Sequence, residues 1–247
     1  MKPGKQRLDQ LLVDRGLVET KSRAQALVMA GLVFSGERKL DKPGESLRPD
    51  LPLEVRQSGP GWVSRGAFKL IQGLDEFAID PAGLVCLDVG ASTGGFTEVL
   101  LARRARRVYA VDVGYGQLAQ KLRTDERVVN LERTNARHLT PEQVPEPVDL
   151  LVCDASFIGL ATVLPTPMAF CAPDARAVVL IKPQFEVGPE RVGKGGVVRD
   201  PALHEEVCQR MRDWFQAAGW AVLGIATSPI TGPAGNVEFL LAARRSG

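Results

Sequence analysis

The sequence has little of the material from which metal centres and disulfide frameworks are built. Its 247 residues include only two histidines and four cysteines. The cysteines lie far apart and form no Cys-x-x-Cys pair, which argues against a zinc site. Cys86 and Cys153 fall inside predicted buried strands. We therefore expect inert, reduced thiols of an intracellular protein, and no bound metal.

The sequence also lacks the segments that direct a chain into or across a membrane. No apolar run approaches the roughly 20 residues that a membrane span needs. Residues 1–10 are basic and polar with no apolar stretch behind them, so we expect no signal peptide. Hydrophobic residues make up 45% and charged residues 24% of the chain, as in ordinary globular proteins. We expect a soluble, cytoplasmic protein with no membrane partner.

The net charge of +2 is small and unevenly distributed. Residues 1–60 contain 11 Lys and Arg against 8 Asp and Glu, whereas residues 61–247 contain 20 against 21. The excess of positive charge therefore lies on the N-terminal piece. This distribution favours a small module that binds a polyanion, in front of a near-neutral enzyme.

The most informative stretch runs from Leu84 to Phe96. An apolar strand pattern ends in Asp-Val-Gly, passes into a glycine-rich turn and continues as a helical pattern. A second apolar strand, 108–111, ends in Asp112, an acid placed to accept both hydroxyls of a ribose. Because Ser92 stands at the second glycine position of the dinucleotide pattern Gly-x-Gly-x-x-Gly, the turn suits a nucleoside without a pyrophosphate. S-adenosylmethionine (SAM) fits that description, and an ordinary strand–loop–helix corner is the alternative.

Candidate cofactor contacts share a position at or near the carboxyl ends of predicted strands, where open α/β sheets bind ligands. They are Asp88, Gly90, Ser92, Gly94, Gly95, Phe96, Asp112, Asn135 and Asp154. The glycines are expected to let the backbone approach the ligand. Asn135 is expected near the adenine of the cofactor.

Strand and helix patterns alternate through the larger part of the chain. Strands are predicted at 84–89, 108–111, 128–131, 148–153, 175–181, 220–227 and 236–243, with helices at 117–123, 159–171 and 201–218. This alternation predicts an α/β, Rossmann-like sheet that is mostly parallel with an antiparallel edge. Residues 188–198 contain four glycines and little that packs, so a mobile loop is predicted there.

The N-terminal part is predicted to be a separate small α+β unit. Two helical patterns fill residues 7–31, and short strands are predicted at 32–34 and 53–55. The predicted division of the chain is a small domain at 1–57, a linker at 58–63 and the α/β domain at 64–247.

Four charged residues stand out against their apolar surroundings. Asp154 follows the fourth predicted strand and Lys182 the fifth, so both should flank the cofactor site. Glu238 interrupts the apolar last strand, and Lys69 lies on a helix that Ser64 is expected to cap. The apolar face of that helix is predicted to comprise Ala67, Phe68, Ile71, Leu74 and Phe77.

Two acids and two lysines that converge would satisfy each other's charges. Each lysine should then lower the pKa of the other, and a lysine tuned in this way can help to deprotonate a hydroxyl. Taken one at a time, each of the four is better explained as a salt-bridged surface residue, but the four together are not.

The N-terminal residues resemble a known RNA-binding unit. Arg7–Leu12, Ser22–Ala26, Gly31–Val33 and Gly36 are similar to the αL motif of a small-subunit ribosomal protein, which also occurs in pseudouridine synthases and bacterial tyrosyl-tRNA synthetases. The resemblance implies that the second helix and the following loop face RNA phosphates. The candidate RNA contacts are Arg7, Lys21, Ser22, Arg23, Arg38, Lys39 and, from the larger domain, Arg65. Solvated surface charges are the alternative.

The larger domain resembles the FtsJ-like family of RNA 2′-O-methyltransferases, whose Lys-Asp-Lys-Glu tetrad matches Lys69, Asp154, Lys182 and Glu238. With the front module, nearly the whole chain resembles the TlyA family, also called hemolysin A. The resemblance implies SAM-dependent methylation of a ribose 2′-hydroxyl, at cytidine, with ribosomal RNA or ribosomal subunits as partners. The 2′-oxygen would attack the sulfonium methyl in line. Lys182 would contact the hydroxyl, Asp154 would position Lys182, and the other two would complete the network.

Three alternatives remain open beside this interpretation. The first is a non-catalytic RNA-binding or ribosome-assembly factor, against which the intact tetrad argues. The second is a membrane-active hemolysin, which no apolar span or strongly amphipathic basic helix supports. The third is a methyltransferase for DNA or small molecules, which the 2′-hydroxyl chemistry disfavours because only RNA offers that group.

Overall fold

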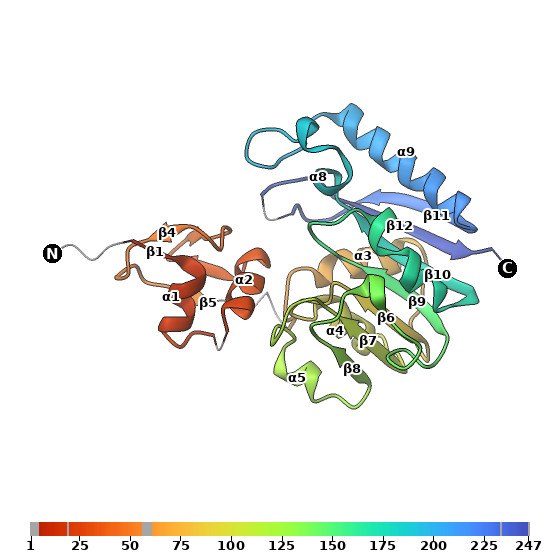
Figure 1. Cartoon of the computed structure of the whole chain (residues 1–247), viewed down its shortest axis with the longest axis horizontal. Coiled ribbons are helices and arrows are strands. Elements are labelled where there is room, and N and C mark those ends of the chain that lie inside the picture. Colours follow the sequence, from red (N-terminus) through yellow and green to blue (C-terminus); the bar gives the residue numbers. More distant parts are fainter. Residues whose placement is uncertain (1–4, 19, 56–60, 233, 247) are drawn as a thin grey trace.

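The protein is described by a computed structural model that covers residues 5–18, 20–55, 61–232 and 234–246. A small N-terminal domain lies at one end of the long axis and a larger α/β domain lies at the other (Figure 1). Each domain has a hydrophobic core of its own. The predicted boundary after residue 57 and the first three residues of the predicted linker, 58–63, lie outside the described residues.

The strands of the larger domain form one sheet. They are β6 (Val85–Val89), β7 (Arg107–Val111), β8 (Val128–Leu131), β9 (Val148–Cys153), β10 (Cys171–Ile181), β11 (Trp220–Thr227) and β12 (Phe239–Arg245). Their order is β11-β12-β10-β9-β6-β7-β8, with β12 antiparallel to both neighbours and the other pairs parallel. The predicted fold class is confirmed. Because the chain order reverses between β6 and β9, a ligand is expected at the carboxyl ends of these strands.

Helices cover both faces of the sheet, because buried strands direct successive side chains to opposite cores. Within β10, for example, Val178 belongs to one core and Val179 to the other. The first face is covered by α3 (Ala67–Glu76), α4 (Gly95–Ala102) and α5 (Gln120–Arg123). The second face is covered by α6 (Leu160–Val163), α7 (Pro165–Ala169) and α9 (Pro201–Ala217), and Figure 1 shows α9 running beside β11.

The predicted helix at 159–171 is two short helices. Pro165 begins the second one, because its ring and its missing amide hydrogen cannot continue the first. The start of α9 agrees with the prediction: Ala202 N donates to Asp200 Oδ1 at 2.9 Å, and Pro201 is the first residue. No helix in the described ranges is long and apolar enough to cross a membrane. The remaining elements are α8 (Pro183–Glu186) and two 3₁₀ turns, η1 (Ala136–His138) and η2 (Pro189–Arg191).

The small domain packs two helices against short strands. Its elements are β1 (Gln6–Arg7), α1 (Leu8–Asp14), α2 (Lys21–Met29), β2 (Val33–Ser35), β3 (Arg38–Lys39), β4 (Ser46–Leu47) and β5 (Glu54–Val55). The two helices agree with the prediction, and the strands predicted at 32–34 and 53–55 correspond to β2 and β5. Thr20 caps α2 by accepting from Arg23 N at 3.1 Å, and Gly31 follows it with a φ of +70°. The pairing of β1 with β4 was not predicted, because strands of two residues carry no periodic pattern.

The buried face of α3 differs from the predicted one. Phe68 is 40% exposed, whereas Lys69 and Leu70 are buried. The helix lies this way because Lys69 reaches two carboxylates inside the domain, which leaves Phe68 on the outside. Ser64 does not cap the helix either: its hydroxyl accepts from Gly66 N at 3.2 Å, and α3 has no side-chain cap.

The segment 188–198 packs more closely than predicted. Val197 and Val198 are buried. Asn236 holds the segment on two sides, because Val198 N donates to its Oδ1 and its Nδ2 donates to Gly196 O, both at 2.9 Å. The pattern of the segment itself could not show this, since its partner lies 40 residues further along the chain.

The register of α3 predicts different consequences for two neighbouring apolar residues. We expect Leu70→Ala to lower the free energy of unfolding by about 2–5 kcal/mol, because it leaves a cavity in the core. Phe68→Ala should lower it by less than about 1 kcal/mol, because that side chain is already partly in solvent. Urea denaturation followed by circular dichroism measures both. Equal losses, or a larger loss for Phe68→Ala, would contradict the observed register.

Candidate active site

Four charged side chains from distant parts of the chain meet near the carboxyl ends of the central strands. Lys69 Nζ lies 2.6 Å from Glu238 Oε2 and 3.4 Å from Asp154 Oδ2. Lys182 Nζ lies 2.6 Å from Asp154 Oδ1. The structure therefore brings together all four residues of the predicted tetrad, and the Asp154 carboxylate bridges the two lysines.

Each member of the tetrad is fixed by a different element. Lys69 lies in α3, Asp154 directly follows β9 and Lys182 directly follows β10. Glu238 lies just before β12 and not within it, so the predicted start of that strand at residue 236 was wrong. The space beside Glu238 accepts only glycine, because a Cβ added to Gly232 would lie 2.5 Å from Glu238 Oε1.

Burial and ion pairing shift the pKa values of Lys69 and Asp154 in opposite directions. Lys69, Lys182 and Glu238 are 7%, 6% and 1% exposed. Burial alone would lower the pKa of Lys69, but the charges of Asp154 and Glu238 outweigh it and raise that pKa above its usual value. Burial alone would raise the pKa of Asp154, but Lys182 and Lys69 hold it below its usual value. The predicted lowering for Lys69 is therefore wrong, and Lys69 stays an ammonium ion at neutral pH.

Lys182 has a further partner in Ser156, for which no role was predicted from the sequence. Its Nζ donates to Asp154 O at 3.1 Å and to Ser156 Oγ at 2.9 Å. The next residue, Phe157, has a φ of +66° and is 76% exposed, and its ring packs on that of Phe185 with 5.2 Å between centroids. The Asp-x-Ser spacing after a buried strand was the one sequence signal that pointed to Ser156.

The glycine turn after β6 is packed against protein atoms. A Cβ would come within 2.9 Å of another protein atom at each of Gly90, Gly94 and Gly95. At Gly90, which has a φ of +83°, those atoms are the backbone N and Cα of Ala155. Gly90 is thus required by the packing of the chain itself, whatever a ligand adds. The contact also places the turn directly beside Asp154.

Asp112 holds the other side of this turn. Its Oδ2 accepts from Ser92 N at 2.8 Å and its Oδ1 accepts from Gly114 N at 2.7 Å. A carboxylate offers about four lone-pair sites, so capacity remains for the hydroxyls of a ribose. Asn135 is exposed, and its Oδ1 accepts from Arg137 N at 3.1 Å at the start of η1.

Asp88, near the end of β6, is fully buried, and only one of its two carboxylate oxygens accepts a hydrogen bond. Thr97 Oγ1 donates to its Oδ2 at 2.7 Å, whereas its buried Oδ1 has no hydrogen-bond partner in the part of the chain that the structure describes. Burial raises the pKa of Asp88 to about 7. An unpaired buried acceptor beside a glycine turn fits a ligand that brings a hydrogen-bond donor. Phe96 lies in the core and supports the turn from within.

Arg7, the first predicted RNA contact, is fixed by a buried acid. Its Nε and Nη2 donate to the two carboxylate oxygens of Asp9 at 3.0 and 2.8 Å. Gln25 Nε2 donates to Asp9 Oδ2 at 2.8 Å. Burial alone would raise the pKa of Asp9, but these hydrogen bonds hold it below its usual value. Arg7 therefore links β1 to α1 and α2, and its half-exposed side chain is only in part available to RNA.

Three other predicted RNA contacts lie on the surface of the small domain. Lys21 is exposed at the start of α2, and Lys39 is half-buried in β3. Arg38 is exposed and forms an ion pair with Glu45. The region that the family resemblance assigns to RNA therefore carries cations in solvent.

Ser22 and Arg23 contact the larger domain. Gln117 Nε2 donates to Ser22 Oγ at 2.8 Å, and the Arg23 guanidinium donates to Gln117 O. Arg65, the predicted contact from the larger domain, donates to Thr231 O at 3.0 Å. Part of the predicted RNA surface is thus used to join the domains, which the sequence could not show because the partners are about a hundred residues away.

The family models match the two domains separately. The model described as FtsJ-like methyltransferase matches residues 62–245, and the model described as S4 domain matches residues 6–51. The chain belongs to the FtsJ-like methyltransferase family. The predicted family membership and the predicted RNA-binding module are confirmed.

Individual relatives extend over nearly the whole chain. The 16S/23S rRNA (cytidine-2′-O)-methyltransferase TlyA of Mycobacterium tuberculosis is 52% identical over 95% of this chain and 88% of its own. Hemolysin A of Brachyspira hyodysenteriae is 37% identical over 95% of this chain and 98% of its own. A hemolysin-like protein from Streptococcus thermophilus has a solved structure with a TM-score of 0.75 and 39% identity, covering 98% of this chain and 89% of that one.

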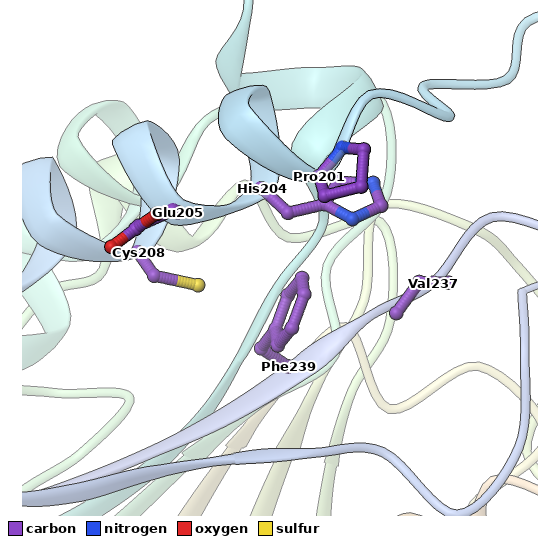
Figure 2. Close-up of a pocket in the computed structure, with 6 residues that line it drawn as sticks. All are labelled: Pro201, His204, Glu205, Cys208, Val237 and Phe239. Carbon is purple, nitrogen blue, oxygen red and sulfur yellow. The ribbon is translucent and has the colours of Figure 1, made fainter.

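The FtsJ-like domain also has a pocket of about 350 Å³ between α9 and the start of β12 (Figure 2). His204 and Cys208 extend from α9 toward Phe239, whose ring meets the His204 ring edge-on with 5.5 Å between centroids. Phe239 packs on the α9 side of the sheet, whereas Glu238 contacts Lys69 on the α3 side. The sheet therefore separates this pocket from the tetrad. Within the described residues, no group of three or more His, Cys, Asp and Glu side chains is arranged to hold a metal ion.

The two charges of the Lys69–Glu238 pair depend on each other for stability. We expect Lys69→Met and Glu238→Leu each to lower the free energy of unfolding by about 3–5 kcal/mol, because each leaves a buried charge unpaired. The double variant should lose clearly less than the sum of the two, since both charges are then gone. Urea denaturation at pH 7 measures the cycle. Additive losses would contradict a direct pair.

The Lys69→Met variant also reports the direction in which the pKa of Lys69 is shifted. Because the pKa of Lys69 is raised in the folded state, its contribution to stability is fully present below the unfolded value of about 10.4 and is lost as pH rises through the folded value. The stability difference between the wild type and Lys69→Met should therefore stay constant from pH 7 to 9. A difference that shrinks within that window would indicate a lowered pKa.

Proposed function

We propose that this protein transfers the methyl group of SAM to the 2′-hydroxyl of a cytidine ribose in ribosomal RNA. The observation that carries the proposal is the joined tetrad, with Asp154 between two lysine amines beside the glycine turn. The match to the FtsJ-like methyltransferase model and the 52% identity to a cytidine-2′-O-methyltransferase support the same reaction. Because the substrate is ribosomal, we place the protein in the cytoplasm.

The residues at the ends of β6 and β7 fit SAM. Asp112 has acceptor capacity for the two ribose hydroxyls, and the unpaired oxygen of Asp88 fits a donor such as the amino group. When bound, SAM supplies a sulfonium-activated methyl group for attack by an oxygen nucleophile. Gly90 keeps the turn against residue 155, so that the cofactor residues and Asp154 share one rigid corner.

The two lysines have different roles in this proposal. Lys69 is locked between Glu238 and Asp154, and it holds the Asp154 carboxylate in place. Lys182 is held by the same carboxylate and contacts the 2′-hydroxyl of the substrate. The hydroxyl proton passes to water, and the Lys182 ammonium stabilises the charge that develops on the 2′-oxygen. No covalent enzyme intermediate is needed, so alignment of the reacting atoms supplies much of the rate enhancement.

We further propose that residues 1–57 form the RNA-binding domain, residues 58–63 the linker and residues 64–247 the methyltransferase domain. The small domain would bring ribosomal RNA to the tetrad through phosphate contacts. Its exposed Lys21 and half-buried Lys39 support this assignment, since both lie in the region that the S4 match covers.

The direct test is transfer of a labelled methyl group from SAM to ribosomal subunits, followed by mapping of the 2′-O-methylated nucleotides. We expect the wild type to modify a cytidine. Lys182→Ala should lose about 10²–10⁴-fold in turnover, because its ammonium acts on the reacting oxygen, and should keep most of its affinity for SAM. Lys194→Ala, an exposed lysine on the 188–198 segment, is the matched control. Full activity of Lys182→Ala would remove the assignment of Lys182, and an inactive wild type would refute the proposed reaction.

A second test concerns the small domain. The double substitution of Lys21 and Lys39 by Ala should weaken RNA binding and reduce the slope of log affinity against log salt by about 1–2, because two phosphate contacts are lost. Filter binding at several salt concentrations measures the slope, with Lys194→Ala again as the control. If the double variant has the same salt slope as the wild type, Lys21 and Lys39 do not contact phosphates.

A further inference from the structure

The amine of Lys182 is surrounded by three oxygens from one short segment. Asp154 Oδ1 lies at 2.6 Å, Asp154 O at 3.1 Å and Ser156 Oγ at 2.9 Å. A lysine ammonium has three N–H donors and no acceptor. Asp154 O and Ser156 Oγ accept hydrogen bonds from the amine, and Asp154 Oδ1 forms an ion pair with it. Because all three oxygens lie within 3.1 Å of the amine, we expect a substrate hydroxyl to reach Lys182 by displacing one of them.

Ser156 is the partner that is easiest to displace. Asp154 O belongs to the main chain at the end of β9, and Asp154 Oδ1 belongs to a charged carboxylate that Lys69 also holds. Ser156 contributes a neutral hydroxyl and is exposed. Its neighbour Phe157 is held at a φ of +66°, a conformation that costs a bulky residue free energy. The turn that carries Ser156 to the amine is therefore strained, whereas both contacts of Asp154 are firmly fixed.

We propose that Ser156 is a positioning residue for Lys182, and that its hydroxyl occupies the place that the 2′-hydroxyl of the substrate takes during methyl transfer. The two groups are chemically alike, since each is a neutral hydroxyl whose oxygen accepts from the ammonium. Before RNA binds, Ser156 keeps the buried amine satisfied. When the ribose arrives, its hydroxyl replaces that of Ser156. The inference rests on the proposed function, because it requires a ribose hydroxyl on the substrate.

This exchange predicts how RNA binding depends on the 2′-hydroxyl. In the wild type, a target without the hydroxyl leaves Ser156 on Lys182, so no donor loses its partner. In Ser156→Ala, the same target leaves an N–H of the 6%-exposed Lys182 unpaired, which is unfavourable. A ribose target still supplies an acceptor in that variant. Removal of Ser156 should therefore make binding more sensitive to the 2′-hydroxyl.

The experiment uses the full chain and two synthetic versions of the shortest ribosomal RNA fragment that the wild type methylates. One version has ribose and the other 2′-deoxyribose at the mapped cytidine. Dissociation constants are measured with S-adenosylhomocysteine present, so that no turnover occurs. We expect the two fragments to bind the wild type equally, within about twofold, and Ser156→Ala to bind the deoxy fragment about tenfold more weakly than the ribose fragment.

Two variants accompany Ser156→Ala. Ser156→Thr keeps a hydroxyl and should restore the wild-type ratio, whereas Ser246→Ala removes an exposed serine near the end of the chain and should leave the ratio unchanged. Equal ratios in the wild type and Ser156→Ala would overturn the inference, as would a loss of turnover in Ser156→Ala as large as that of Lys182→Ala. Failure of the wild type to methylate any ribosomal RNA would instead refute the proposed function, so the two failures are distinguishable.

Discussion

The carboxylate of Asp154, held between the amines of Lys69 and Lys182, is the contact on which the rest of the site depends. Two lysines and two acids make a group without net charge, and that neutrality allows three charged side chains to be buried and that of Asp154 to be largely buried at the end of a sheet. Each charge offsets the desolvation cost of its neighbours, so no member is dispensable on its own. The arrangement also separates the roles of the lysines. Lys69 is enclosed by carboxylates, whereas Lys182 faces a neutral, exposed serine.

The proposed cofactor region depends on the same corner of the fold. Gly90 lies so close to the backbone of Ala155 that a side chain at residue 90 would push the turn away from Asp154. Asp112 fixes the far side of the turn through Ser92 N. The turn is therefore held by the protein before any ligand binds. A transfer reaction that depends on alignment benefits from this, because neither the methyl donor nor the attacking oxygen must wait for the backbone to order.

The sequence predicted the position of a side chain correctly wherever that position follows from the strand or helix to which the residue belongs. Apolar runs located the strands of the sheet, and the rule that ligands bind at the carboxyl ends of parallel strands placed Asp154 and Lys182 near each other. The sequence did not predict the position of a side chain wherever a contact with a residue far along the chain determines it. Lys69 is buried in place of Phe68 because carboxylates 85 and 169 residues away attract the lysine. Asn236 fixes the glycine segment from 40 residues away, and Ser156 gains a role only through Lys182. Such contacts leave no periodic pattern in the sequence.

The domain contact connects the proposed RNA-binding surface with the proposed cofactor site. The loop after β7 begins at Asp112, whose carboxylate accepts from Gly114 N, and reaches Gln117, which contacts Ser22 and Arg23 of the small domain. One short loop is thus held by the predicted ribose-binding acid at one end and by α2 at the other. Lys21, which we expect to contact RNA, is adjacent to Ser22 in that helix. The expected phosphate site at the start of α2 and the acid at residue 112 are therefore joined by one loop, residues 112–117, whose two ends are both held by hydrogen bonds.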